Sequence, residues 1–120
     1  MRAQMVGATT ADSKPLQGVD ALKMGKEYVV LEVFVPHGRD PLFRIEFIEG
    51  EDSALFDSRA FRVTSSALPP TWHYFHFDTG SFALRPKPWG QLGFWEAYYE
   101  HTPWAIETYE TEKRKILLSS

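Results

Sequence analysis

The strongest pattern in the chain is a run of apolar residues over Tyr28–Val35, rich in β-branched side chains and apolar at odd and even positions alike. It predicts a central strand, because a strand covered on both faces needs no polar alternation. In Phe43–Phe47 the apolar side chains alternate with Arg44 and Glu46, which is typical of a strand with one buried face. The intervening Pro36–Pro41 contains two prolines and a glycine and predicts a turn.

Three further strands are predicted downstream. Arg59–Ser65 alternates apolar with polar residues, and two adjacent prolines separate it from a strand over Thr71–Phe77. Asp78-Thr79-Gly80 has the chemistry of a hairpin turn, and Ser81–Leu84 would be the short returning strand. Because two prolines end that strand, we expect it at a sheet edge. Together these runs predict an antiparallel meander of four to five strands.

Towards the end of the chain the apolar period becomes helical. Gln91–Glu100 carries a stripe formed by Leu92, Trp95 and Tyr99. Thr102 followed by Pro103 predicts the start of a second helix, with an N-cap and then proline at the first position. The apolar face of this helix would consist of Ile106, Tyr109, Ile116 and Leu117. The predicted fold is therefore α+β, an antiparallel sheet with two C-terminal helices on one face.

The N-terminal part of the chain has a different composition. Residues 1–26 contain few large apolar side chains, so we expect a flexible tail with a short turn near Val19–Met24, followed by one folded domain over residues 27–120. The segment that starts at Met1 lacks the apolar centre of a secretory signal, and no apolar run is long enough to span a bilayer. We therefore expect a cytoplasmic protein that does not enter a membrane.

Composition restricts the chemistry that the chain can perform. The 120 residues include no cysteine, which excludes disulfides, thiolate zinc sites and thiol catalysis. A formal charge of −3 lacks the dense Lys and Arg of a phosphate-binding surface, so we expect no nucleic acid as a partner. Nine Phe, five Tyr and four Trp provide large rings for a core or a binding surface.

One segment is similar to a catalytic motif. Phe77–Ser81 resembles the Asp-Thr-Gly turn of aspartic proteases, where two such turns bring two carboxylates together. The flap and the later apolar segment of that family are missing, so we interpret these residues as a hairpin turn. Glu96 and Glu100 would share a helix face and are interpreted as its solvated edge. No other catalytic signature is recognisable, and we expect no enzymatic activity.

The four histidines do not predict a metal site. His73 and His76 are three residues apart, so on a strand their side chains point to opposite faces. His37 lies in a predicted turn and His101 between the predicted helices, and neither has the spacing of metal ligands. We therefore expect no metal ion and no cofactor.

Two groups of residues could recognise a partner. Five carboxylates gather around one predicted loop, namely Glu46, Glu49, Glu51, Asp52 and Asp57. The strand over Thr71–Phe77 has an aromatic face formed by Trp72, Tyr74 and His76. Its other face is also apolar enough to be core, so this strand is either an exposed platform or fully buried. Aromatic side chains beside carboxylates suit a cationic protein partner better than RNA.

The segment Pro86-Lys87-Pro88-Trp89-Gly90-Gln91-Leu92-Gly93-Phe94-Trp95-Glu96-Ala97-Tyr98-Tyr99 resembles small bacterial immunity proteins of polymorphic and contact-dependent toxins. The resemblance covers roughly the last third of the chain. It implies a non-catalytic inhibitor that neutralises a cognate toxin by covering the toxin's active site. The weak net charge departs from the strongly acidic inhibitors of nuclease toxins, which argues against a nuclease as the target.

We therefore expect a non-catalytic protein-binding domain of the immunity kind, with the acidic loop for electrostatic steering and aromatic side chains as anchors. Two alternatives stay open. One is a small-molecule-binding or enzymatic domain with an aromatic pocket between sheet and helices. The other is a subunit of a larger assembly, with a broad apolar patch. The sequence is equally compatible with a monomer and a homodimer.

Overall fold

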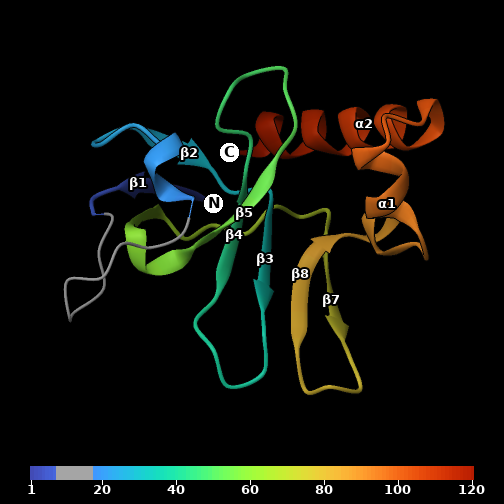
Figure 1. Cartoon of the computed structure of the whole chain (residues 1–120), viewed down its shortest axis with the longest axis horizontal. Helices are drawn as coiled ribbons and strands as arrows, with labels where there is room; N and C mark the ends of the chain where they lie inside the picture. Colours follow the sequence, from blue (N-terminus) through green and yellow to red (C-terminus); the bar gives the residue numbers. More distant parts are fainter. Residues whose placement is uncertain (8–17) are drawn as a thin grey trace.

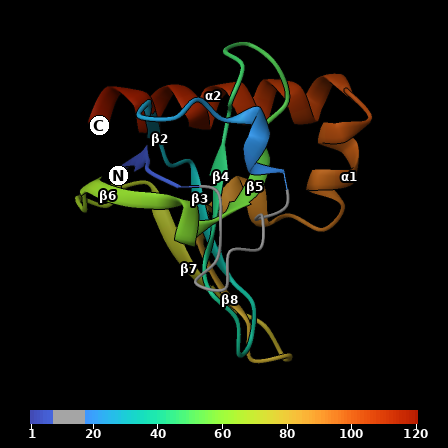
Figure 2. The same ribbon diagram turned by 60° about the vertical axis from the view of Figure 1, so that its left-hand side comes forward.

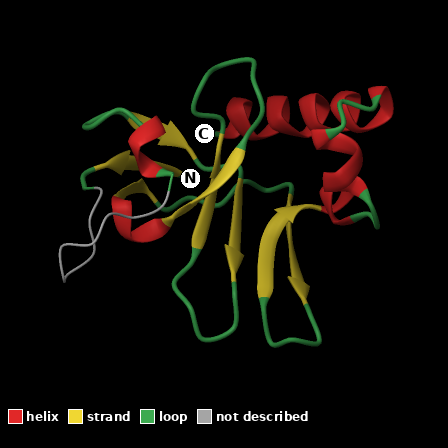
Figure 3. Ribbon diagram, viewed as in Figure 1, coloured by secondary structure: helices red, strands yellow, loops and turns green. Residues whose placement is uncertain are grey.

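The computed structural model describes residues 1–7 and 18–120 of the chain. Within this part, eight strands form two antiparallel sheets, and two α-helices follow at the C-terminal end (Figure 1, Figure 3). The predicted α+β class is confirmed. The smaller sheet has the order β2-β1-β6 and consists of β1 (Arg2–Met5), β2 (Glu27–Val29) and β6 (Phe61–Ser65).

The larger sheet has the strand order β5-β4-β3-β8-β7. Its members are β3 (Glu32–Val35), β4 (Leu42–Ile45), β5 (Ala54–Asp57), β7 (Trp72–His76) and β8 (Phe82–Pro86). The turn predicted between residues 36 and 41 joins β3 to β4, as expected. The Asp-Thr-Gly segment is the predicted hairpin turn between β7 and β8, since the N–H of Gly80 donates to the carbonyl of Phe77 and Gly80 has a φ of +86°.

β8 is an interior strand, and the prediction that it forms an edge is wrong. It pairs with β3 on one side and with β7 on the other, so β7 is the edge. Pro86 fits because it is the last residue of β8, beyond the residues that pair with β3. At the opposite edge lies β5, which has no counterpart among the predicted strands.

The single strand predicted over Tyr28–Val35 is in fact two strands that belong to different sheets. The break falls at Val30 and Leu31, whose amides donate to carbonyls of Met1 and Arg44 respectively. Val30 is buried in one apolar cluster and Leu31 in the other. The run is apolar on both faces because the chain passes here from one core to the next.

The first residues are strand rather than the predicted flexible tail. β1 lies between β2 and β6 and pairs antiparallel with both. Its Ala3 and Met5 side chains are buried. Few large apolar side chains are needed, because backbone hydrogen bonds to the strands on both sides hold β1 in place. The predicted turn near residue 19 is a short 3₁₀ helix, η1 (Val19–Ala21). The part of the predicted tail over residues 8–17 lies outside the described residues.

Two helices end the chain, α1 (Phe94–Tyr99) and α2 (Pro103–Ser119), preceded by the 3₁₀ helix η3 (Lys87–Gly90). The start of α2 at Pro103 is confirmed, although the Thr102 side chain makes no capping bond. α1 begins later than predicted because Gly93 caps it in a left-handed conformation, which leaves Leu92 outside the helix and fully exposed. Within the described part of the chain, no helix is long and apolar enough to cross a membrane.

Around β3 and β4 the larger sheet is covered on both faces, whereas His73, Tyr74 and His76 on β7 are exposed. One face packs on the smaller sheet through an apolar cluster that includes Ala3, Met5, Tyr28, Val33, Phe43, Ile45 and Phe56. The helices cover the other face, through stacked and tilted rings of Trp89, Phe94, Tyr98 and Tyr109. Arg44 lies on this second face and is 4% exposed, so the strand predicted to have one solvated face is buried on both.

Candidate functional site

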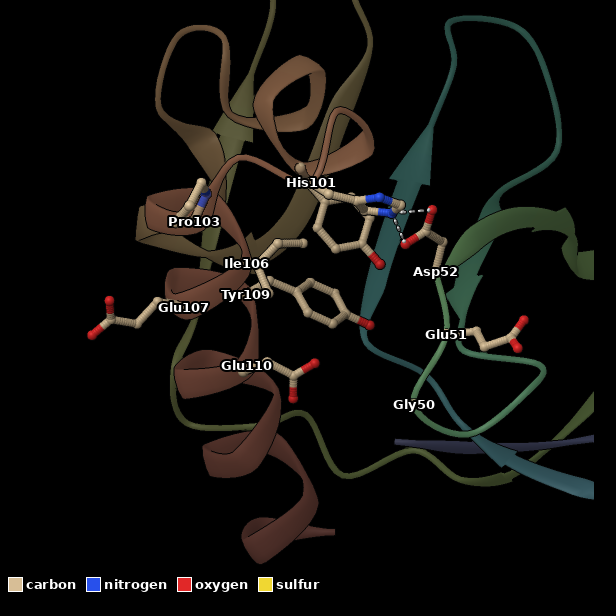
Figure 4. A pocket seen from close by; sticks show the side chains of 10 residues that line it. Gly50, Glu51, Asp52, His101, Pro103, Ile106, Glu107, Tyr109 and Glu110 are labelled. Carbon is tan, nitrogen blue, oxygen red and sulfur yellow. Dashed lines mark hydrogen bonds and ion pairs between the residues drawn. The ribbon is translucent and has the colours of Figure 1, made fainter.

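A pocket of about 600 Å³ opens between the β4–β5 loop and the corner where α1 meets α2 (Figure 4). Its lining residues come from both sides of the opening, and they are Gly50, Glu51, Asp52, Tyr98, His101, Pro103, Ile106, Glu107, Tyr109 and Glu110. The volume lies in the range of ordinary ligand sites. The acidic loop that the sequence singled out therefore forms one wall of a pocket, and the start of α2 forms the other.

The helix corner has a fixed shape. The N–H of His101 donates to the carbonyl of Tyr98 and the N–H of Thr102 to that of Ala97, which is the hydrogen-bond pattern of a Schellman motif. The residue at the left-handed position of this motif is usually glycine, yet here His101 occupies it with a φ of +58°. A side chain at this position is strained relative to glycine.

That imidazole joins the two walls of the pocket. Nε2 of His101 lies 3.0 and 3.1 Å from the two carboxylate oxygens of Asp52. The dashed lines in Figure 4 show this contact bridging the loop and the helix corner. The contact links the β4–β5 loop to the helix corner at an exposed position, since the side chains of His101 and Asp52 are 65% and 45% exposed.

Buried tyrosine hydroxyls fix the floor of the pocket. The Ser53 amide donates to the Tyr98 hydroxyl at 2.8 Å, and the Tyr109 hydroxyl donates to Oε2 of Glu46 at 2.6 Å. Burial raises the pKa of both phenols, and for Tyr109 the bond to Glu46 raises it further. Both hydroxyls therefore stay protonated and hold the loop from below.

The rim of the pocket is acidic while its interior is partly apolar. Ile106 and the ring of Tyr109 face the opening, and Asp52 and Glu110 approach it from opposite walls (Figure 4). Glu107 points away from the loop, towards solvent. Carboxylates above an apolar floor suit a cation on an apolar stem, because the stem can lie on the rings while the charge meets the acids.

Searches with the sequence and the structure found no matching family model, no matching curated protein and no matching solved structure. The site's chemistry must therefore be inferred from its own geometry. Among residues 1–7 and 18–120, no group of three or more His, Asp or Glu side chains is arranged to hold a metal ion.

The five predicted carboxylates do not act as one group. Glu46 is half-buried and accepts bonds from Tyr109, from Lys113 Nζ at 3.2 Å and from the Gly50 amide, so it supports the loop instead of facing a partner. Glu51 and Asp52 line the pocket, and Glu49 is exposed beside it.

Asp57 lies apart from the acidic loop, at the far end of β5. It caps the 3₁₀ helix η2 (Ser58–Ala60), where its carboxylate accepts the Arg59 amide at 2.9 Å. The hydrogen bond from the Arg59 side chain lowers the pKa of Asp57. Its placement beside Glu46–Asp52 is the part of the prediction that the geometry does not support.

The predicted aromatic face of Thr71–Phe77 is split by the fold. Trp72 is half-buried, and its indole N–H donates to the Leu31 carbonyl at 3.1 Å. Tyr74 is 61% exposed and stacks at a tilt on Phe82 and His76. Two views place β7 well away from the β4–β5 loop, so these rings and the acidic pocket are separate surfaces (Figure 1, Figure 2).

Of the ten pocket residues only Glu51 and Asp52 were expected as site residues, and the unexpected ones include His101, Glu107 and Glu110. Glu107 and Glu110 are three apart on a helix and share a face, which the helical period could have indicated. The position of His101 immediately before the Thr102-Pro103 helix start was a visible signal of a corner. Neither signal indicated which loop the corner would face.

Proposed function

We propose that this chain is a cytoplasmic, non-catalytic protein-binding domain that receives a Lys or Arg side chain of its partner in the pocket between the β4–β5 loop and α2. The observation that carries the proposal is the pocket itself, with Asp52 and Glu110 above a floor of tyrosine rings, where an incoming cation would share Glu110 with Lys113 Nζ at 2.9 Å and Asp52 with His101. The hydrogen-bonded floor and the Asp52–His101 bridge are in place before a partner arrives, which reduces the entropy lost on binding.

We further propose that the partner is a cognate toxin, and that the domain is an immunity protein covering the toxin's active site. The resemblance of residues 86–99 to immunity proteins supports this proposal. That segment builds η3 and α1, and α1 contributes Tyr98 to the pocket floor. An acidic pocket would be able to engage a cationic catalytic or substrate-binding residue of such a toxin.

The alternative of a small-molecule or enzymatic site between the sheet and the helices has less support. Rings of Trp89, Phe94 and Tyr109 occupy that space in mutual contact, and Trp89 is fully buried. His73 and His76, which such a site would use, are exposed on β7. An amine-bearing small molecule in the acidic pocket would share the chemistry that we propose for the protein side chain.

The first test asks whether the pocket prefers a cation. Nα-acetyl-arginine amide, titrated against the ¹⁵N-labelled protein, should shift the amides of Asp52, His101 and Glu110 with an affinity on the order of 1 mM. Nα-acetyl-citrulline amide has nearly the same shape without the charge and should leave these amides in place. Equal shifts with both probes, or shifts elsewhere only, would refute a cation-selective pocket.

A charge-reversed variant then connects the pocket to the partner. Glu51→Lys combined with Asp52→Lys changes two pocket carboxylates, whereas Asp20→Lys combined with Asp78→Lys makes the same change in net charge at exposed positions outside the pocket. The wild type, the control and the pocket variant are each used to capture proteins from a lysate of the native host. The proposed partners are the proteins that the wild type and the control capture and the pocket variant does not. For a captured partner, association should be slower with the pocket variant than with the control.

The two experiments also distinguish the source of the cation. Binding of the arginine probe together with a partner that the pocket variant loses supports the protein-binding proposal. Binding of the probe while every captured protein is retained by the pocket variant points instead to a free amine ligand, and contradicts the proposed partner.

A further inference from the structure

The edge strand β7 has backbone groups without a partner. In an antiparallel pair, hydrogen-bonded positions alternate with positions whose amides point away from the neighbour. The Phe77 amide donates to the Ser81 carbonyl, so by alternation Phe75 and His73 also bond to β8. Tyr74 and His76 therefore direct their N–H and C=O groups outwards, and no strand of the described residues lies beyond them.

This edge lacks the features by which most sheets avoid pairing with another chain. Exposed edges usually carry Lys, Pro or a bulge that blocks a further strand. β7 reads Trp-His-Tyr-Phe-His, with neither a proline nor a permanently charged residue. Tyr74 and His76 are exposed along it. The edge can therefore pair with a further strand that carries aromatic side chains.

An apolar pocket lies directly beside the same edge. It has a volume of about 470 Å³ and is lined by Phe75, Lys87, Pro88, Gly90 and Gln91. The Phe75 ring can lie close to η3 because Gly90 has no side chain, and a Cβ there would lie only 2.6 Å from Phe75 Cε1. A large apolar side chain next to Phe75 on the same face could enter this space.

We propose that β7 pairs antiparallel with β7 of a second copy of this chain, which joins two five-stranded sheets into one continuous sheet across a two-fold axis. In the register that we infer, Tyr74 lies opposite the partner's His76, and Phe75 lies opposite the partner's Phe75 on the axis. The outward amides and carbonyls of Tyr74 and His76 then form four hydrogen bonds, two in each direction.

The side chains along the β7 edge are complementary to themselves across a two-fold axis, so we infer that the strand pairing with β7 belongs to a second copy of this chain. The central pairs across the axis, Tyr74 with His76 and Phe75 with Phe75, are aromatic, which stabilises cross-strand contacts. The partner's Phe75 arrives beside the apolar pocket, and the symmetry provides the same contact in return. A register centred on Tyr74 fits less well, because it would need the Trp72 amide, which already donates to the Pro69 carbonyl.

The dimer is independent of the proposed acidic pocket, because β7 lies well away from the β4–β5 loop (Figure 1, Figure 2). Its test is the mass of the purified protein by light scattering and sedimentation over a range of concentrations. We expect twice the 13.8 kDa of one chain at high concentration, and slowed hydrogen exchange at the Tyr74 and His76 amides as the dimer forms.

Two variants locate the contact. Tyr74→Lys places a charge beside the axis in both copies, and we expect dimerisation to weaken at least about tenfold. The matched control is Leu92→Lys, which adds the same charge at a fully exposed position outside the strand and should dimerise normally. His76→Pro removes one outward N–H that the β7–β8 pairing does not use, so the fold should survive while the dimer is lost.

Three results would overturn the proposal. The first is a single-chain mass at all accessible concentrations. The second is a dimer that forms as tightly with Tyr74→Lys and His76→Pro as with Leu92→Lys. The third is a dimer whose protected amides lie outside β7.

Discussion

The guanidinium carbon of Arg44 lies 3.6 Å from the centroid of the Trp95 ring. The same guanidinium donates to Glu32 at 2.6 Å and to the Tyr99 hydroxyl at 2.7 Å, and Glu32 also accepts Arg85 Nη1 at 3.2 Å. Burial alone would lower the pKa of Arg44, but Glu32 and Tyr99 outweigh it and raise the pKa. A permanently charged group thus joins the larger sheet to α1.

We expect Arg44→Ala to lower the free energy of unfolding by about 3–5 kcal/mol, because it removes one partner of a buried ion pair and the cation on Trp95. Urea denaturation measures this change. Arg2→Ala is the control, since the side chains of Arg2 and its partner Glu27 are 37% and 45% exposed and their pair should contribute within about 0.5 kcal/mol. Similar losses for both variants would show that the buried contacts of Arg44 contribute nothing beyond a surface pair.

The carboxylates of the β4–β5 loop should differ in whether their substitution lowers stability or binding. Glu46→Gln weakens bonds to Tyr109, Lys113 and Gly50 in a half-buried site, so we expect a loss of about 1–3 kcal/mol in thermal or chemical denaturation. Glu51→Gln changes an exposed side chain and should stay within about 0.5 kcal/mol. In binding assays the substitution of Glu51 should have the larger effect, by slowing association with the partner. A stable Glu46→Gln protein would contradict the structural role of Glu46.

His101→Gly should make the protein more stable and the pocket less effective. Glycine adopts the left-handed conformation without strain, so we expect a gain of up to about 1 kcal/mol, reduced by the lost contact with Asp52. The affinity for the arginine probe should fall, because the loop loses its link to the helix corner. Calorimetry and the probe titration measure the two effects on one sample. A destabilised variant would mean that the Asp52 contact outweighs the backbone strain.

The buried tyrosines predict a loss of stability at alkaline pH. Because the pKa of Tyr98 and that of Tyr109 are raised in the fold, each phenol stabilises the protein fully below its ordinary pKa of 10. Above pH 10 the unfolded chain loses these protons while the fold retains them. The free energy of unfolding should then fall by up to about 1.4 kcal/mol per pH unit for each tyrosine that keeps its proton in the fold.

Tyr109→Phe should make the free energy of unfolding fall less steeply with pH, because one of the two buried phenols is removed. Tyr74→Phe, at an exposed position, serves as the matched control. Denaturant titrations at several pH values between about 9 and 11, on either side of the ordinary tyrosine pKa, give the slopes. An unchanged slope in Tyr109→Phe would show that its hydroxyl titrates in the fold as it does in the unfolded chain.

Local patterns predicted the elements that depend on neighbouring residues. The alternation in residues 43–47, the glycine turn at Gly80 and the Thr102-Pro103 helix start all act within a few residues, and the structure confirms each element. β1 was not predicted because its stability comes from β2 and β6, which lie far away in the sequence. Composition alone made residues 1–7 look like a tail.

The site was predictable only on one side. Glu51 and Asp52 are close in sequence and were expected to act together, and they do line one wall. His101 and Glu110 meet that wall only because Tyr98 and Tyr109 fix α1 and α2 against the loop through hydroxyl contacts with residues 53 and 46. No periodic pattern in a single sequence reports such long-range contacts.

The junction at Val30 and Leu31 has a consequence for how the chain tolerates insertions and deletions. Strand side chains alternate between faces, so one residue added at this junction would reverse every side chain of β3. Glu32 would then face the apolar cluster around Val33 and Phe43, and Val33 would face Arg44. The two-residue spacing at this point is therefore a fixed length in the protein, whereas the exposed loop before β7 has room to lengthen.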